Sequence, residues 1–352
     1  MHLLDALEQR FTVAIVGQMR VGKSTLLNAL IGKRLAPTGV TETTATINWF
    51  RHGTDALCDC FRVHWLNGDT ETFPLSEVSK WIGDEENARQ TRSLDFFADT
   101  DFLRIANVVD TPGTRSVLEA HEEAVQGFLD GKLENDTLAH GGRADAVVYA
   151  LNPVGRASDK DLLQLFGDRT RLPGASAYNS IAVVQKWEHL KPDPIAAVRE
   201  KCRRLREQLS GKVSEVIPTS GLLAQLAQSV PTKIWHTVQR LAVDSEETAL
   251  RKIMRADSLF CRESDGIALS TTERECIKQH IPWVVLPLCV MLAQQQELSG
   301  GDELRKSVLE LSGLARLRSL LQERFFARAK LIKASTVLAK AWEPCQTALL
   351  RM

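Results

Sequence analysis

The sequence predicts an α/β fold: a mostly parallel, doubly wound sheet followed by an α-helical bundle. Up to about residue 230, short apolar runs alternate with helical patterns, as the strands and crossover helices of a parallel sheet do. Beyond that residue the strand signals stop, and the remaining patterns are helical. We therefore expect a sheet domain over residues 11–230 and a helical region made of residues 1–10 and 231–352.

The composition excludes several classes of protein. The chain has 352 residues, enough for two domains, and its 44 Lys and Arg balance its 44 Asp and Glu. Because no net charge attracts it to polyanions, we expect no nucleic-acid partner. Seven scattered cysteines, an odd number, indicate ordinary thiols in a reducing cytoplasm. No signal peptide opens the sequence, and its longest apolar run, residues 281–293, is shorter than the ~20 residues of a spanning helix. We expect a soluble, cytoplasmic protein.

A glycine loop separates the first strand from the first helix. Residues 17–25 read GQMRVGKST and match the pattern G-x-x-x-x-G-K-[ST], between an apolar run at 11–16 and a helical pattern at 26–31. Glycines let successive backbone N–H groups face one concavity, where they bind phosphate oxygens beside the positive end of the helix. The lysine adds a point charge for the outer phosphates, and the serine hydroxyl is a ligand for Mg²⁺. We expect the whole loop to bind a nucleotide: Gly17, Gln18, Met19, Arg20, Val21, Gly22, Lys23, Ser24 and Thr25.

The remaining elements follow in order. Further strands are expected at residues 45–51, 58–66, 70–73, 102–109, 145–151, 181–184 and 213–218. Asn67-Gly68 is a hairpin signal between the second and the third of these. Helices are expected at residues 76–92, 158–165, 195–209, 233–261, 271–279, 301–311 and 314–350. Ser270 and Glu273 predict a capping box at the start of the helix at 271–279.

Two further motifs suit phosphate chemistry. Asp110 ends a buried run and opens the sequence DTPG, where a carboxylate can hold a Mg²⁺-bound water and Gly113 lets a backbone N–H approach a terminal phosphate. Thr43 and Thr44 lie in a polar segment that leads into the second strand. A threonine there can complete the coordination of Mg²⁺ while the terminal phosphate is present, which describes an order–disorder switch. The alternatives are a plain turn at 110–113 and ordinary strand threonines at 43–44.

GQMRVGKST, the Thr43-Thr44 pair, DTPG and the helical last third together resemble the dynamin superfamily of large GTPases, the bacterial dynamin-like proteins in particular. The resemblance is strongest over residues 11–230 and weaker over residues 312–350. It implies a Ras-like P-loop GTPase core with a helical bundle, and a Mg²⁺-dependent hydrolase that binds GTP and GDP. It also implies dimerisation across the nucleotide face, with a second copy or a paralogous dynamin-like partner, and often work on membranes. Peripheral membrane contact is therefore an option for this chain.

The resemblance assigns roles to single residues. Lys23 and Ser24 match the ligands of the phosphates and of Mg²⁺. Thr44 matches the switch threonine, and Asp110 and Gly113 match the second switch. The metal ligands that the resemblance implies are Ser24, Thr44 and Asp110, the last through water.

Arg20 adds a hypothesis about catalysis. Guanylate-binding proteins, a related branch, carry arginine in a similar GxxRxGKS loop, where it acts as an arginine finger supplied in cis. A guanidinium beside the β–γ bridge would stabilise developing charge, so Arg20, Lys23 and Thr44 are the catalytic residues that the resemblance implies. The alternative is a solvated loop arginine, and the two carry equal weight.

The base-reading motif departs from the family pattern. The family has [NT]-K-x-D after the fifth strand, whereas this chain has QKWE at residues 185–188. The resemblance gives Lys186 the task of packing on the base, and Glu188, one methylene longer than Asp, the task of accepting guanine N–H groups. Ser220 and Gly221 resemble the last guanine-contacting loop. Guanine is favoured, and an ATP-using enzyme stays as an alternative.

Two segments are candidates for membrane contact. The apolar run 281–293 is either a membrane-touching tip or a buried helix pair, and its length favours burial. Residues 312–340 contain one glutamate and seven basic residues: Arg316, Arg318, Arg324, Arg328, Lys330, Lys333 and Lys340. This basic run would suit anionic lipid, but such a run is more often the solvated face of a long helix. A further alternative function is a nucleotide-gated switch or scaffold with no membrane action.

Overall fold

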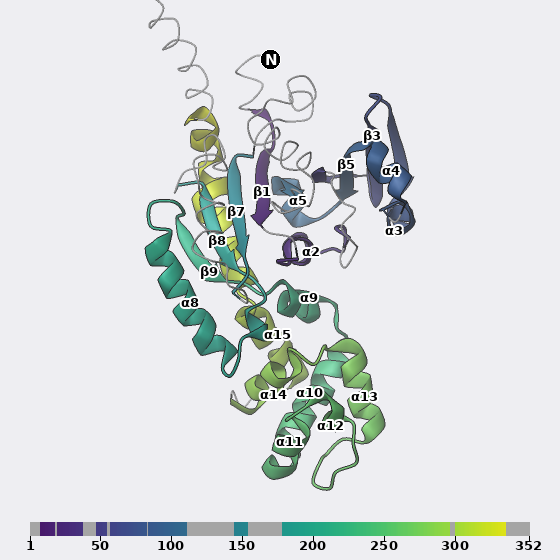
Figure 1. Ribbon diagram of the computed structural model, residues 1–352, viewed down its shortest axis with the longest axis vertical. Helices are drawn as coiled ribbons and strands as arrows, with labels where there is room; N and C mark the ends of the chain where they lie inside the picture. The colour runs from purple at the N-terminus through teal and green to yellow at the C-terminus, as the bar shows by residue number, and fades with distance from the viewer. Residues whose placement is uncertain are drawn as a thin grey trace, which may run out of the picture.

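The structure is a computed structural model that describes residues 8–17, 20–37, 47–54, 57–82, 84–110, 144–153, 178–295 and 300–335. In these residues the chain forms a nine-stranded sheet, with a group of helices below it (Figure 1). The strand order across the sheet is β4 (Thr70–Pro74), β3 (Cys60–Trp65), β5 (Thr91–Ala98), β2 (Ile47–His52), β6 (Ala106–Asp110), β1 (Phe11–Gly17), β7 (Ala146–Leu151), β8 (Ser180–Val184) and β9 (Glu215–Pro218).

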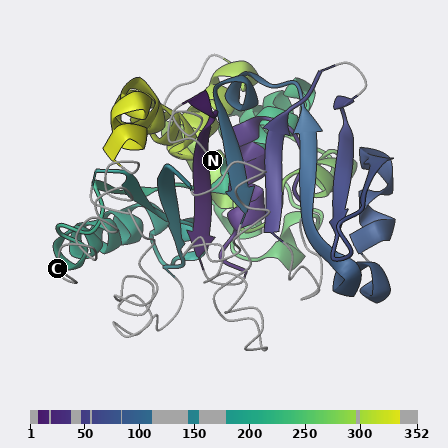
Figure 2. The ribbon, with the colours of Figure 1, turned by 90° about the horizontal axis from the view of Figure 1, so that it is seen from above.

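The sheet is mostly parallel, as the alternation of strands and helices predicts. β1 pairs in parallel with β6 and β7, β8 pairs in parallel with β7 and β9, and β2 pairs in parallel with β5. Antiparallel pairs join β2 to β6 and β3 to both β4 and β5. The strand that leads into the phosphate loop, β1, therefore lies inside the sheet between two parallel neighbours (Figure 2).

The helices follow the chain from the phosphate loop to the end of the described residues. The sheet part holds α2 (Lys23–Ile31), α3 (Val78–Ile82), α4 (Glu85–Gln90), α5 (Asp101–Ile105), α8 (Pro194–Gln208) and α9 (Gly221–Ser229). After them come α10 (Thr232–Asp244), α11 (Glu247–Ile253), α12 (Asp257–Phe260), α13 (Thr271–His280), α14 (Leu286–Gln295), α15 (Gly301–Leu311) and α16 (Leu314–Leu320). The chain stays helical from α16 to residue 335, with a π-helical turn at Leu321–Phe325.

Two apolar cores lie on the two faces of the sheet. Because successive strand residues point to opposite faces, Val13 and Ile15 of β1 join one core, and Ala14 and Val16 join the other. The first core is completed by side chains of α2, α5 and α16. The second is completed by α8 and α9 and continues into α10, α13, α14 and α15. Apolar burial is thus continuous from the sheet into the helical region, and it supplies the main stabilising term of the fold.

The apolar run at 281–293 is buried, as its length predicts. Ile281, Val285, Leu286 and Cys289 are fully buried, and α14 packs against α10 and α15. None of the described helices combines the length and the apolar character needed to cross a bilayer. The predicted capping box is confirmed at α13, where Ser270 and Glu273 hydrogen-bond to each other's backbone N–H groups.

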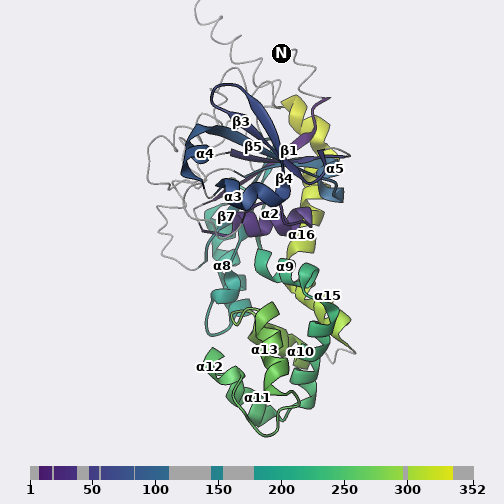
Figure 3. The ribbon, with the colours of Figure 1, turned by 90° about the vertical axis from the view of Figure 1, so that its right-hand side faces the viewer.

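The last described helical stretch lies on the sheet rather than among α10 to α14 (Figure 3). Phe326 makes an edge-on contact with Phe11, with ring centroids 5.5 Å apart. Arg318 donates from Nη2 to the carbonyls of Ala29 and Leu30, at 3.2 and 2.8 Å, and so binds the C-terminal end of α2. Lys333 is buried and donates to the carbonyl of Gln9. The basic run is therefore not uniformly solvated. The domain division at residue 230 stays a prediction.

Three predicted elements were wrong in their bounds. The helix at 76–92 is divided into a short turn at Leu75–Glu77, α3 and α4. It ends at Gln90 because residues 91–98 form β5, whose buried Asp95 pairs with Arg51 of β2 (Nε to Oδ2, 3.2 Å). The strand at 102–109 begins as α5, because the Thr100 side chain caps a helix there by accepting from the Leu103 N–H. The helix at 233–261 is broken into α10, α11 and α12. The helix expected at 158–165 lies outside the described residues.

Candidate nucleotide site

The phosphate loop turns tightly between β1 and α2 because two of its positions admit only glycine. A Cβ at Gly17 would lie 2.4 Å from the carbonyl oxygen of Ala150 on β7. Gly22 has φ +102, in the left-handed region, and is the N-cap of α2. Arg20 also has a positive φ, 58, which is uncommon for a side chain of its size. The described part of the loop is therefore a sharp turn that ends on the N-terminus of a nine-residue helix.

Lys23 lies across this turn. Its Nζ donates to the Gly17 carbonyl at 3.0 Å. Burial lowers the pKa of the Lys23 ammonium, and the neighbouring Asp110 carboxylate raises it. The ammonium is thus held beside the end of β1, within the turn, where a bound phosphate would meet it.

Ser24 and Asp110 meet although 86 positions separate them in the chain. The Ser24 hydroxyl donates to Asp110 Oδ2 at 3.3 Å, and Asp110 Oδ1 is buried with no hydrogen-bond partner among the described residues. Burial raises the pKa of Asp110, while Lys23 and the Ser24 hydroxyl lower it. A hydroxyl beside an unsatisfied carboxylate oxygen is a donor set that suits Mg²⁺, which is bound by one or two protein oxygens plus substrate phosphates. In the described residues no group of three or more His, Cys, Asp or Glu could hold a metal.

The loop after β8 lies on the phosphate loop. Lys186 has φ 55, and its Nζ donates to the backbone carbonyl of Arg20. A Cβ placed on Gly22 would be 3.7 Å from Cε of Lys186, so the lysine stem runs along the glycine. Glu188 is buried, which raises the pKa of its carboxyl, and the hydroxyl of Ser220 hydrogen-bonds to this group and opposes the rise.

The loop after β9 closes the same corner. Ser220 is the N-cap of α9, and its hydroxyl oxygen accepts from the Leu223 N–H at 3.1 Å. Gly221 packs so tightly on α2 that a Cβ would lie 2.7 Å from the Leu26 nitrogen. The Gly221 N–H donates to Oε1 of Gln185 at 3.3 Å. Gln185 was not among the predicted site residues; a buried polar residue directly after an apolar strand was the signal that could have found it.

The structure therefore gathers most of the predicted site residues at one edge of the sheet, beyond the carboxyl ends of β1, β6, β8 and β9, where ligands of such sheets bind. The residues gathered there are Gly17, Arg20, Val21, Gly22, Lys23, Ser24, Thr25, Asp110, Lys186, Glu188, Ser220 and Gly221. The others lie outside the described residues: Gln18, Met19, Thr43, Thr44 and Gly113. The roles given to all of them stay predictions.

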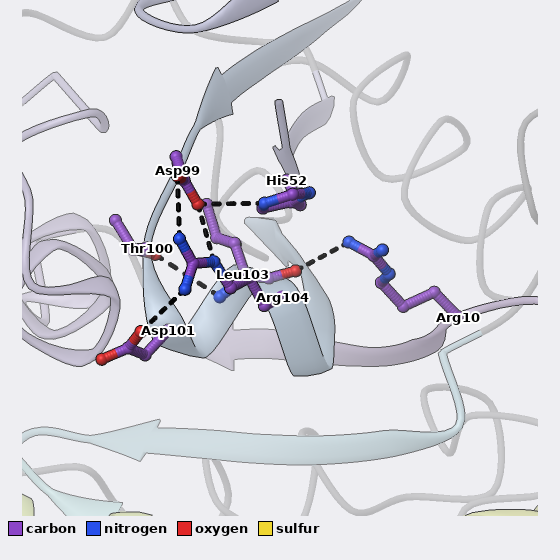
Figure 4. Close-up of polar contacts among 7 residues, drawn as sticks. All are labelled: Arg10, His52, Asp99, Thr100, Asp101, Leu103 and Arg104. Atoms are coloured by element: carbon purple, nitrogen blue, oxygen red, sulfur yellow. Dashed lines mark hydrogen bonds and ion pairs between the residues drawn. The ribbon is translucent and has the colours of Figure 1, made fainter. Parts of the chain in front are cut away.

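The opposite edge of the sheet carries an exposed ionic cluster (Figure 4). Asp99 accepts from His52 Nε2 at 3.0 Å and from Arg104 through two bonds of 2.8 and 2.9 Å. Mainly through the bond from Arg104, the pKa of Asp99 is lowered to about 2. Nearby, Arg10 donates to the Leu103 carbonyl at 2.9 Å and links the start of β1 to α5. The cluster ties strand ends together, far from the phosphate loop.

Residues 13–138 match the family model described as the dynamin family. This part of the chain is similar to the dynamin family. The matched stretch contains the phosphate loop and Asp110, in agreement with the resemblance read from its motifs.

Two curated relatives show how far this dynamin-family likeness extends. The isoniazid-induced protein IniC of Mycobacterium tuberculosis is 27% identical over 353 aligned positions, which cover 97% of this chain and 68% of IniC. Dynamin-like protein 2 of Campylobacter jejuni is 28% identical over 199 positions, 55% of this chain and 29% of that protein. A solved bacterial dynamin pair, described as sensing and tethering membranes, is 20% identical with a TM-score of 0.46 and covers 82% of this chain and 39% of its own.

Proposed function

We propose that the chain is a Mg²⁺-dependent GTP hydrolase of the bacterial dynamin-like kind. The observation that carries the proposal is the meeting of Lys23, Ser24 and Asp110 at the turn before α2. A cation, a hydroxyl and an unsatisfied carboxylate oxygen are the three groups that a Mg²⁺–triphosphate needs from its protein. The dynamin-family match over the same residues supports GTP as the nucleotide.

Each of these residues has a task in the proposal. Lys23 exchanges its bond to the Gly17 carbonyl for phosphate oxygens, and the backbone N–H groups at the start of α2 add further donors. Ser24 and Asp110 hold Mg²⁺, together with Thr44. When bound, the ion neutralises charge that develops on the phosphates. Arg20, whose φ is positive, either stabilises that charge as a finger in cis or stays in solvent.

The partner is a second copy of the chain or a paralogous dynamin-like protein, bound across the nucleotide face as an isologous or pseudo-isologous pair. The description of the solved bacterial pair as oligomerised is the motive for this part of the proposal. Sedimentation with a non-hydrolysable GTP analogue is expected to show a dimer. A monomer both with the analogue and with a transition-state mimic would refute the proposed dimer, and the proposal of GTP hydrolysis would still stand.

The proposal further includes membrane remodelling by a cytoplasmic protein that contacts the bilayer peripherally. The alternative is a nucleotide-gated switch or scaffold, and burial of the run at 281–293 favours it over insertion of that run. Flotation of the full chain with anionic and with neutral vesicles separates the two. Recovery of the protein with vesicles supports membrane action, and its absence at both compositions supports the switch.

Hydrolysis is tested by phosphate release from GTP and from ATP, with Mg²⁺ and with EDTA. We expect release from GTP that EDTA abolishes, and little from ATP. Equal or preferred release from ATP would replace the proposal by its ATP-using alternative.

A further inference from the structure

The strand β4 ends the sheet on one side, and no other described strand pairs with its outer edge. The β3–β4 hairpin lies at the right-hand end of the sheet in Figure 1. Thr70, Glu71 and Thr72 are all exposed, although the threonines point to one face of the sheet and Glu71 to the other. Because both faces are open at these residues, a further strand can approach the edge and pair with its N–H and C=O groups.

Hydrogen bonds to β3 fix which backbone groups of β4 point outwards. Just beyond one end of the ladder, the Leu75 N–H donates to the Asp59 carbonyl at 2.9 Å. Just beyond the other end, the Trp65 N–H donates to the Asp69 carbonyl at 3.0 Å. Hydrogen-bonded and non-bonded pairs alternate along an antiparallel ladder. The odd-numbered residues of β4 therefore bond to β3, and the even-numbered residues direct their backbone groups away from the sheet.

These outward groups favour pairing with a second copy of the same strand. Thr70 and Thr72 each present an N–H and a C=O, whereas Pro74 presents a C=O alone. In a two-fold antiparallel pair centred on Thr72, two bonds join the central threonines. A further bond runs from the Thr70 N–H of each copy to the Pro74 carbonyl of the other, so proline is tolerated at this edge.

The side chains favour this register over its neighbours. A shift of two residues one way places Glu71 of both copies directly opposite each other, and like charges in that position are destabilising. A shift the other way is centred on Phe73 and sets Thr72 against Pro74, so half of the bonds of the centred register are lost. In the centred register Glu71 lies opposite Phe73, and the two central threonines form a favourable cross-strand pair.

A cavity adjoins one end of this edge. It has a volume of about 610 Å³ and is lined mainly by the residues that follow α2 and by those that connect β4 to α3. Leu35 and Leu75 contribute apolar surface, and Lys33 on the rim pairs with Asp59. Arg34, also on the rim, is exposed and forms no ion pair with another residue that the structure describes. The rim therefore offers a guanidinium to an anionic group from outside.

The other end of the edge is acidic. Asp69 is exposed, and its carboxylate accepts a bond of 2.7 Å from Nδ2 of Asn67. In the centred register Asp69 lies opposite Leu75 of the second copy, with Cβ atoms about 5 Å apart. Both side chains point, like Phe73, to the side of the sheet that α2 covers, where the cavity lies. The carboxylate thereby comes within reach of Arg34 of the second copy, in two symmetry-related contacts.

We propose that β4 pairs with β4 of a second copy of this chain, so that the two sheets join edge to edge and Asp69 of each copy binds Arg34 of the other. Within one copy these two residues lie at opposite ends of a five-residue strand, about 17 Å apart along it, and do not pair. The interface lies five strands from β1 in the sheet order and does not depend on nucleotide. A chain that also pairs through the nucleotide face has two isologous surfaces, and alternating pairs build a linear assembly.

The first test is sedimentation velocity of the nucleotide-free full chain over a range of concentrations. We expect a monomer that shifts towards a dimer as the concentration rises. Thr72→Pro removes the two central donors of the pair, and because this N–H points outwards, the bonds to β3 stay in place. This variant should stay monomeric, whereas the control Thr72→Val, which keeps the N–H, should dimerise like the unaltered chain. An unaltered chain that stays monomeric, or a folded Thr72→Pro variant that dimerises equally, would overturn the proposal.

Charge reversal tests the contacts at the two ends of the strand, and it also tests the pairing if Thr72→Pro does not fold. Asp69→Lys and Arg34→Glu should each weaken dimerisation roughly fivefold or more, because each sets like charges against each other in two places. Combined in one chain, the two substitutions should restore the dimer. Failure of the combination to recover, with unaltered circular dichroism, would overturn the assignment of Asp69 and Arg34. Loss of the β4 pair would leave the proposed GTP hydrolysis standing, and loss of nucleotide binding would leave the β4 pair standing.

Discussion

Gly313 joins α15 to α16 and lies against the loop that precedes α9. It has φ +73, and a Cβ there would be 2.2 Å from the carbonyl oxygen of Pro218. Next to it, the Ser312 carbonyl accepts from the Ser220 N–H at 2.8 Å. Gly313→Ala therefore lowers the stability in two ways. A side chain on a left-handed backbone costs about 1–2 kcal/mol, and the overpacked contact with Pro218, which forces the chain to move, costs about 1–3 kcal/mol. We expect a loss of about 2–5 kcal/mol in the free energy of unfolding.

Gly211 supplies the matched control. It has φ +74 but nothing within 4 Å of its Cβ position, so Gly211→Ala carries the backbone effect alone, about 1–2 kcal/mol. Denaturant unfolding of the two variants measures the difference, at unchanged m-value. The affinity for GDP should fall several-fold in Gly313→Ala, because Ser220 moves with Ser312, and should be unchanged in Gly211→Ala. Equal stability and equal affinity in the two variants would refute the claim that this junction supports the loop that precedes α9.

Two further predictions concern the site itself. The Arg20→Gly variant suits the positive φ of that position, so its GTP affinity should stay within a few-fold of that of the unaltered chain. Its rate of GTP turnover should fall by about 10³ or more, and Arg20→Lys serves as the comparison variant. Unchanged turnover would leave Arg20 as a solvated loop residue. Burial raises the pKa of Glu188 in the folded chain, so the protonated form favours folding and this contribution is lost as the pH rises through the folded-state value. Glu188→Gln, which stays neutral, should therefore unfold at a higher temperature than the unaltered chain at pH 7–8 and at the same temperature near pH 4. A variant less stable at pH 8 would show that the buried carboxylate is well compensated.

Local patterns were enough for the elements whose signals lie within a few residues. The glycine turn before α2, the first strand and the Asn67-Gly68 hairpin were predicted correctly, because each depends on glycine conformation or on strand periodicity. β5 was missed because Asp95 interrupts its apolar run, and the partner that makes a buried aspartate tolerable, Arg51, lies on another strand. α5 was missed because a single hydrogen bond from the side chain of Thr100 decides its start.

The sequence predicted which residues belong to the candidate site, but not which of them contact one another. Sequence spacing gives no means of pairing Ser24 with Asp110 or of laying Lys186 on the Arg20 carbonyl, 166 positions away. Those contacts follow from the order of the parallel strands, which bring the ends of β1, β6 and β8 to one edge. Gln185 looked like a departure from a family pattern, and its bond from the Gly221 N–H became visible only in the structure.

The central claim is that the turn around Lys23 binds the phosphates of a guanine nucleotide. Isothermal titration of Mg²⁺-GTP into the full chain and into Lys23→Ala, with circular dichroism to verify the fold, tests it most directly. We expect the folded variant to lose at least about a hundredfold in affinity, because it loses the buried ammonium that faces the phosphates. Binding of GTP by folded Lys23→Ala with the affinity of the unaltered chain would contradict the account.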